Sequence, residues 1–189
     1  MSSLDSTFEE LVSLLGKPEA LDPAKSDPVF YFVHDPQQTL EVKRSIPRWI
    51  ARLRQDGHQV QTVSLARLLW DAIDGSGRWD DWLDSEADYA PEEINDAVRD
   101  VLRGEHGLVA AVAPYVTGPA AGKVLFLTDA ALVHPYFRLR TLESALHDRF
   151  ETPTVLFYPG SRAGQFGLQF LGFYPEDGNY RSTLLGGNV

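Results

Sequence analysis

The stretch from residue 123 to residue 160 constrains the fold of this chain more than any other. Its two ends, residues 124–127 and 155–158, are short runs of valine, leucine and aromatic side chains without polar alternation. Such runs are typical of strands covered on both faces, as in a parallel sheet between two layers of helices. A helix predicted over residues 139–149 lies between them, so the stretch should form a strand–helix–strand unit with a right-handed crossover.

Strands and helices alternate through the rest of the 189-residue chain. Residues 29–33 and 60–65 are two more candidate strands, and a capping box at residues 6–9 opens a helix near the amino terminus. Further helices are predicted at residues 36–55, 65–73, 91–102 and 108–116. We therefore predict an α/β fold, a Rossmann-like three-layer sandwich whose mostly parallel sheet carries helices on both faces. The length suits a single α/β domain over residues 1–189 better than two domains.

Polar side chains gather where the two strands of residues 123–160 end. In sheets of this kind, ligands and partners usually meet the loops at the carboxyl ends of the strands. The two loops are predicted over residues 128–138 and 159–167. We expect a partner- or anion-binding site built from these loops, with Asp129, His134, Arg138, Arg140 and Arg162 as its candidate residues.

Two of these residues, Arg138 and Arg140, stand at the start of the predicted helix. Positive charge there opposes the helix macrodipole, so the position suggests a negatively charged partner. That partner is either a carboxylate of the same chain, such as Glu143 or Asp129, or an external phosphate or acidic protein. The sequence favours the internal ion pair and leaves the external ligand open.

An acidic segment over residues 71–105 accounts for most of the chain's net charge of −10. It contains 12 aspartate and glutamate residues against three arginines, a net charge of −9, so the remainder of the chain is close to neutral. We predict a helical excursion from the domain here. Its acidic surface is either simply solvated or a docking surface for a basic partner.

Aromatic residues in this segment favour the docking surface. Trp79, Trp82 and Tyr89 lie among the acidic residues, and Trp70 directly precedes them. Aromatic anchors ringed by charge are common at protein interfaces, although such side chains also pack on a domain's own core. We take Trp79 and Trp82 as candidate interface aromatics.

A row of arginines marks the helix predicted over residues 36–55. Arg44, Arg48 and Arg52 recur at four-residue spacing and therefore line one face of the helix. A solvated surface stripe is favoured over a track for phosphates, because the chain as a whole is acidic. We expect no strong direct binding of nucleic acid.

Catalytic and cofactor-binding motifs are absent from the sequence. Residues 118–123 resemble a phosphate-binding P-loop only superficially, because one residue is missing between the glycines and the segment precedes a strand. There is no G-x-G-x-x-G after the first strand, no H-E-x-x-H and no G-x-S-x-G. We expect no catalytic residues, metal or cofactor, and hence a protein that is not an enzyme.

The composition also bears on where the protein works. It has no cysteine, which excludes disulfides and thiolate chemistry and fits a reducing compartment. The first residues lack the basic and apolar regions of a signal peptide. No apolar run approaches the roughly 18 residues that a bilayer span needs. We expect a soluble, cytoplasmic protein without membrane association.

Three short sequences together carry a resemblance to a known family. They are Val-His-Pro-Tyr-Phe-Arg at 133–138, Val-Leu-Phe-Tyr-Pro-Gly at 155–160 and Asn-Tyr-Arg at 179–181. In this order they resemble the BrxB family of BREX phage-defence systems. That family often has glycines where Asp129 and Ala130 stand and histidine where Arg140 stands, so the resemblance carries over no catalytic residue.

The resemblance implies a particular role for the chain. Members of the family are small proteins encoded beside a large ATPase, a methyltransferase and the alkaline-phosphatase-like PglZ protein. It therefore implies a non-catalytic assembly component that docks the PglZ-like protein and contacts other BREX subunits. The alternative, taken from the residues themselves, is a phosphate- or nucleotide-binding module that uses the arginines at the strand ends.

Overall fold

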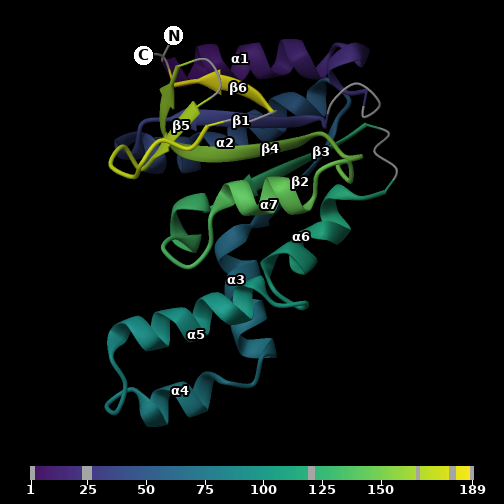
Figure 1. The fold of residues 1–189 in the computed structure, drawn as a ribbon. Helices are drawn as coiled ribbons and strands as arrows, with labels where there is room; N and C mark the ends of the chain where they lie inside the picture. The colour runs from purple at the N-terminus through teal and green to yellow at the C-terminus, as the bar shows by residue number, and fades with distance from the viewer. Residues whose placement is uncertain (1–2, 23–26, 119–121, 165–166, 179–181, 188–189) are drawn as a thin grey trace.

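The structure is a computed structural model of the chain, and it describes residues 3–22, 27–118, 122–164, 167–178 and 182–187. Within these residues, six strands form a central sheet with helices on both faces, and a helical arm projects from one side (Figure 1). The strands are β1 (Val29–His34), β2 (Gln59–Ser64), β3 (Lys123–Thr128), β4 (Thr154–Ala163), β5 (Gly167–Phe170) and β6 (Thr183–Gly186). The order is β2-β3-β4-β1-β6, with every neighbouring pair parallel, and β5 pairs antiparallel with the end of β4.

Burial follows the position of each strand in the sheet. Every residue of β1 and the first seven residues of β4 are buried, because these strands have neighbours on both sides and helices on both faces. β2 lies at an edge and exposes Gln59, Gln61 and Thr62. Polar side chains on an edge strand discourage its pairing with another chain.

Two helical layers cover the sheet, and the side chains of β1 alternate between them. Phe30 and Phe32 share a core cluster with α1 (Ser3–Leu15) and α2 (Thr39–Gln55). Tyr31 and Val33 point to the opposite face, in a cluster with α3 (Leu65–Gly75), α6 (Leu108–Val116) and α7 (Leu139–Ala145). This arrangement confirms the predicted three-layer α/β sandwich. Within the described ranges, no helix combines the length and the apolar character that a bilayer span requires.

Trp49 of α2 is the largest side chain between the first helical layer and the sheet. Its ring stacks on Phe8 of α1 with 5.1 Å between ring centroids, and on Phe157 of β4 with 6.0 Å. Each aromatic pair adds about 0.5–1.5 kcal/mol beyond the area that it buries, so Trp49 ties both helices to the sheet. α2 contains Pro47 and continues through it as one helix.

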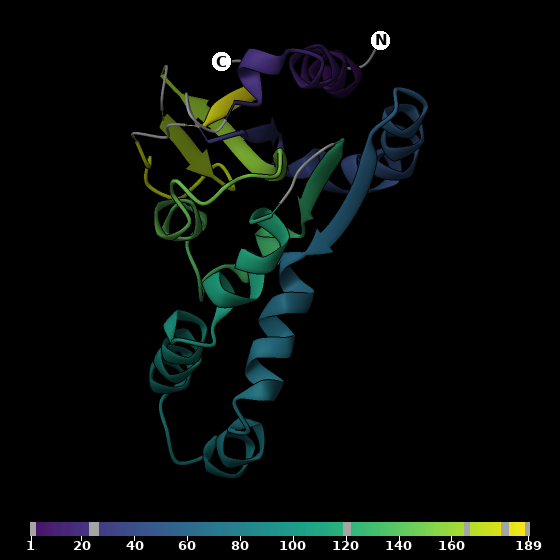
Figure 2. The same ribbon diagram turned by 90° about the vertical axis from the view of Figure 1, so that its right-hand side faces the viewer.

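The helical arm consists of residues 70–105 and carries most of the acidic side chains. The end of α3 leads away from the sheet, α4 (Trp79–Ser85) forms the far end, and α5 (Pro91–Arg103) returns toward the sheet (Figures 1 and 2). Trp82 of α4 and Leu102 of α5 are buried in the same core cluster as Ile73 of α3. The arm therefore has a thin apolar interior that continues the core beneath the sheet.

Three element boundaries differ from the prediction. α1 begins at Ser3 rather than behind a cap at Ser6, and α7 ends at Ala145, four residues early. β4 does not end at Gly160 but continues to Ala163, so most of the predicted loop over residues 159–167 is strand. A Cβ atom on Gly160 would lie 2.3 Å from the carbonyl oxygen of Gln169, so only glycine lets β5 pair closely here.

Candidate functional site

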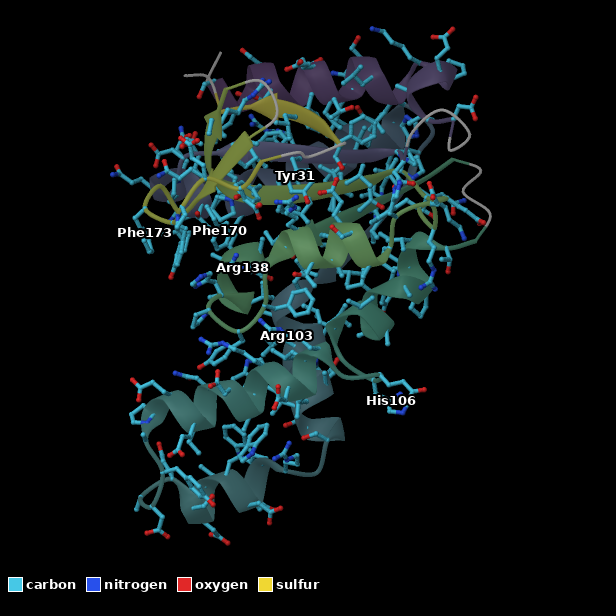
Figure 3. All side chains as sticks on the ribbon, viewed as in Figure 1. Tyr31, Arg103, His106, Arg138, Phe170 and Phe173 are labelled. Atoms are coloured by element: carbon cyan, nitrogen blue, oxygen red, sulfur yellow. The ribbon has the colours of Figure 1, made fainter. Side chains whose placement is uncertain are left out.

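A pocket of about 470 Å³ lies between α5 of the arm and the segment that leads into α7. β5 and the residues after it complete its wall. Figure 3 labels Arg103, Arg138 and Phe170, one from each of these three parts of the chain. The side chains that give the pocket its chemistry are Asp96, Arg99, Arg103, His134, Tyr136, Arg138, Arg140, Phe170, Tyr174, Glu176 and Asp177.

The segment leading into α7 alternates between the core and the pocket. Val133, Phe137 and Leu139 are buried, which anchors the segment beneath the sheet. The N–H groups of Tyr136 and Phe137 both donate to the carbonyl of Val133, at 3.1 and 2.9 Å, and form a tight turn. Arg138 follows this turn in extended conformation and stays exposed at the pocket.

The four arginines of the pocket differ in their ion pairs. Arg99 pairs with Asp96 at 2.6 Å, and Arg140 pairs with Asp177, which lies beyond β5. Among the described residues, Arg103 and Arg138 have no ion-pair partner. Arg140 thus has the internal ion pair that the sequence favours, and the carboxylate is that of Asp177.

Glu143, one of the two carboxylates expected to pair with the arginines, has other partners. Its carboxylate accepts hydrogen bonds from the Tyr31 hydroxyl at 3.0 Å and from the Ser182 hydroxyl at 2.5 Å. Tyr31 is on the central strand β1, and Ser182 directly precedes β6. Glu143 thus links α7 to the sheet.

His134 lies against aromatic rings at the pocket wall. The Tyr174 ring is 3.9 Å away and the Phe170 ring 5.5 Å away, centroid to centroid. Burial lowers the pKa of His134, and the charges of Arg138 and Arg99 lower it further. His134 is therefore neutral at pH 7, and the charge of the pocket comes from its arginines and carboxylates.

Asp129, the second expected carboxylate, lies at a different place from the pocket. It directly follows β3 in a left-handed conformation with φ of 62°, which aspartate tolerates better than most residues. Its carboxylate accepts from the Ser64 hydroxyl at 2.6 Å and the Thr128 hydroxyl at 3.2 Å, and it pairs with Lys43 at 2.6 Å. Burial alone would raise the pKa of Asp129, but hydrogen bonds from Lys43 and Ser64 and the Lys43 charge outweigh it and lower the pKa.

The predicted site therefore divides into separate parts. His134, Arg138 and Arg140 come together in the pocket, whereas Asp129 fastens the ends of β2 and β3 to α2. Arg162 is half-buried on β4 with its Cγ near Gly187, and it is not among the described residues that line the pocket.

Two of the three arginines in the stripe on α2 form ion pairs with carboxylates of the same chain. Arg48 pairs with Asp5 of α1 at 2.5 Å, and Arg52 lies 3.6 Å from Glu9 and 3.0 Å from Asp56. The pairs with Asp5 and Glu9 join α2 to α1 on the solvated surface, and the pair with Asp56 lies at the end of α2 itself. They support the structural interpretation of the stripe over a phosphate track.

The arm exposes a group of apolar side chains, which we call the arm patch: Trp70, Trp79, Leu83 and Tyr89. Their exposed fractions are 49%, 40%, 51% and 53%. Trp70 and Trp79 meet edge to face with 5.6 Å between ring centroids. Trp82, the other candidate interface aromatic, is only 7% exposed, and the guanidinium of Arg78 covers its ring at 5.4 Å. Trp82 thus belongs to the arm's interior, and Trp79 to its surface.

One group of side chains has the spacing of a metal site. Asp27, His147 and Asp148 each offer a ligand atom, and these atoms lie within 4.8 Å of one another. The Nδ1 atom of His147 is 2.6 Å from the Asp27 carboxylate, so the group is already explained as an ion pair or hydrogen bond at the surface. We assign no metal to it.

Several pocket residues escaped the sequence reasoning. Arg99 and Arg103 lie on the acidic arm, and at the level of sequence they were considered only as two of the three arginines in the net charge of that segment. Their four-residue spacing on α5 places both on one face, and this was the available signal. Phe170, Tyr174 and Asp177 come from a region without a predicted element, and only the pairing of β5 with β4 brings them to the pocket.

In comparison with protein families, residues 61–185 match the family described as BREX protein BrxB. These residues include the whole arm, the pocket and the strands from β3 to β5. They make up more than half of the chain. Comparisons with curated proteins and with solved structures give no match.

Proposed function

This chain belongs to the BrxB family of BREX proteins, and we propose that it is a non-catalytic interaction subunit that docks another component of the defence system through its helical arm. Membership of the family makes it a BREX phage-defence component. The further step, from component to docking subunit, rests on the arm.

The observation that carries the proposal is the arm patch on an acidic arm. Within the patch, Trp70 and Trp79 are in contact, and large apolar side chains that lie together on an exposed surface mark interaction sites more often than singly scattered ones do. Trp79 and its partner Trp70 are each at least 40% exposed, and Trp79 belongs to α4, the helix at the far end of the arm (Figure 2). Tryptophan and tyrosine are the residue types that contribute most often to binding hot spots.

Charge indicates the kind of surface that the arm would meet. Residues 71–105 carry a net charge of −9, and α4 carries Asp80, Asp81 and Asp84 in addition to Trp79. Complementary potentials steer association and suppress wrong partners, so the partner should present a basic surface with an apolar centre. We propose the PglZ-like protein as this partner, with other BREX subunits as additional contacts.

The arrangement of polar groups supports a role without catalysis. At the carboxyl ends of the strands, Asp129 is held by Lys43 and two hydroxyls, and the Nδ1–H of His34 donates to the Asp35 carbonyl at 2.9 Å. His34 is also buried, which lowers its pKa. These groups fasten strand ends to the neighbouring helix and loop, as structural polar networks do.

Co-purification tests the proposal. The tagged chain would be co-expressed with the other subunits of a BREX system, and the retained proteins would be identified. We expect the PglZ-like protein to be retained, and a variant with Trp70→Ala and Trp79→Ala to lose it. If no BREX subunit is retained by the wild-type chain, the proposal is wrong.

A further inference from the structure

The pocket between α5 and the α7 segment carries an inference beyond docking. We propose that it binds a small phosphate ligand that bears a planar ring, of the size and chemistry of a mononucleotide. The site is independent of the arm patch. It uses Arg103 and Arg138 for the phosphate and the aromatic wall at His134 and Tyr174 for the ring.

The charge of the pocket is opposite in sign to that of the protein. Four arginines line it against the three carboxylates of Asp96, Glu176 and Asp177, whereas the whole chain has a net charge of −10. Arg103 and Arg138 reach it from separate elements, α5 and the start of α7 (Figure 3). Neither of these two arginines has an ion-pair partner among the described residues, so a bound anion could accept charge-assisted hydrogen bonds from both.

The neighbouring arginines are held in place by their ion pairs. Asp96 holds Arg99 on one side of the pocket, and Asp177 holds Arg140 on the other. A guanidinium has five N–H donors, so a single carboxylate contact at Arg99 leaves several donors for a ligand. Side chains that are already ordered lose less conformational entropy when a ligand binds, which favours affinity.

An aromatic cluster forms the apolar part of the wall. The ring of His134 lies 3.9 Å from that of Tyr174, and Phe170 lies within 6.2 Å of both rings, centroid to centroid. Tyr174 and Phe170 are only partly buried, so their rings remain accessible from the pocket. Planar bases stack on such rings with little dependence on base identity.

Size favours a small ligand. A volume of about 470 Å³ falls within the range of roughly 300–1,000 Å³ that is usual for small-molecule sites. A nucleic-acid polymer would have to pass the acidic arm, whose residues 71–105 carry a net charge of −9. Repulsion between the arm and a phosphate backbone therefore selects against the polymer and leaves the pocket open to a single nucleotide.

Calorimetry at low ionic strength tests the proposal with four probes: adenosine diphosphate, pyrophosphate, adenosine and a short single-stranded DNA. We expect adenosine diphosphate to bind more tightly than pyrophosphate, and adenosine and the DNA to bind least. Arg103→Ala and Arg138→Ala should each weaken diphosphate binding about 10-fold or more, because each removes a charge-assisted hydrogen bond. Tyr174→Ala should reduce the difference in affinity between adenosine diphosphate and pyrophosphate, because it removes a ring on which the base stacks.

Arg44→Ala is the matched control, because Arg44 is an exposed arginine on α2, outside the pocket. It should bind adenosine diphosphate like the wild type.

Absence of heat with adenosine diphosphate at millimolar concentration would overturn the proposal. It would also be overturned if Arg44→Ala weakened the binding of adenosine diphosphate as much as the pocket variants do. Equal affinity for adenosine diphosphate and pyrophosphate would overturn ring recognition, and tightest binding to the DNA would overturn the small-ligand site. Co-purification of the two pocket variants with BREX subunits should be unchanged, which separates this test from that of docking.

Discussion

Trp70 and Trp79 meet edge to face at 5.6 Å, yet each keeps at least 40% of its surface exposed. They come from different helices, α3 and α4, and their contact fixes the far end of the arm. The two rings therefore leave a large apolar surface exposed to solvent. A partner that covers this surface would bury it with little loss of conformational entropy, because the ring contact already orders the two side chains.

Replacement of Trp79 and of Trp82 should have very different effects on stability. Trp79→Ala should lower the free energy of unfolding by about 1 kcal/mol, because it removes one exposed aromatic pair. Trp82→Ala should lower it by about 3–5 kcal/mol, because it empties the interior of the arm. Urea denaturation of the two variants measures the difference. Equal losses would contradict the assignment of Trp79 to the surface and Trp82 to the interior.

The charge of the arm should control how fast it meets its partner. Replacing Asp80, Asp81 and Asp84 together by asparagine should slow association with the PglZ-like protein and flatten the dependence of the association rate on salt. Surface-binding kinetics over a range of ionic strength measure this. Replacing three acidic residues outside the arm, Asp22, Glu41 and Asp56, should change the rate less. If both variants associate more slowly by a similar factor, the net charge of the protein, and not the charge of the arm, controls the association rate.

The hydrogen bond between Tyr31 and Glu143 should stabilise the fold. Tyr31→Phe leaves the partly buried carboxylate of Glu143 with Ser182 and should lower the free energy of unfolding by about 1–3 kcal/mol. Chemical denaturation gives the value. Tyr136→Phe is the control, because Tyr136 lies at the pocket and should change stability little. If Tyr31→Phe leaves the free energy of unfolding unchanged, the hydrogen bond between β1 and α7 does not contribute to stability.

Asp129 should make stability depend on pH in the acid range. Its pKa is lowered in the folded chain, so its contribution is present above the unfolded-state pKa of about 3.9 and is lost as pH falls through the lower folded-state pKa. The free energy of unfolding of the wild type should therefore exceed that of Asp129→Asn by about 1 kcal/mol at neutral pH. The difference is small because Lys43 is half-exposed and solvent screens its charge. In acid, the two free energies should become equal. Unfolding measured from pH 7 to pH 2 checks this, and a gap that widens in acid would contradict the assignment.

Much of the sheet could be predicted because its signal is local. The buried strands β1, β3 and β4 are short apolar runs, and the three-layer arrangement follows from their alternation with helices. The resemblance to the BrxB family, read from three short sequences, is confirmed by the match over residues 61–185. The third of these sequences, residues 179–181, lies outside the described residues.

The pocket could be predicted only in part, because its other half depends on contacts between distant residues. Asp177 reaches Arg140 across 37 residues of sequence, and this requires β4 to continue past Gly160 and pair with β5. Arg103 reaches the pocket only because α5 folds back toward the sheet. In α4, seven residues are too few for periodicity to tell which tryptophan faces inward.

The affinity of the purified chain for the purified PglZ-like protein tests the central claim most directly. We predict that the double variant Trp70→Ala and Trp79→Ala binds about 10-fold or more weakly than wild type, as expected for loss of hot-spot aromatics. Phe173→Ala removes an even more exposed aromatic, at 69%, from the loop after β5 and should bind like wild type. Unchanged affinity of the double variant, or equal loss in Phe173→Ala, would contradict docking through the arm.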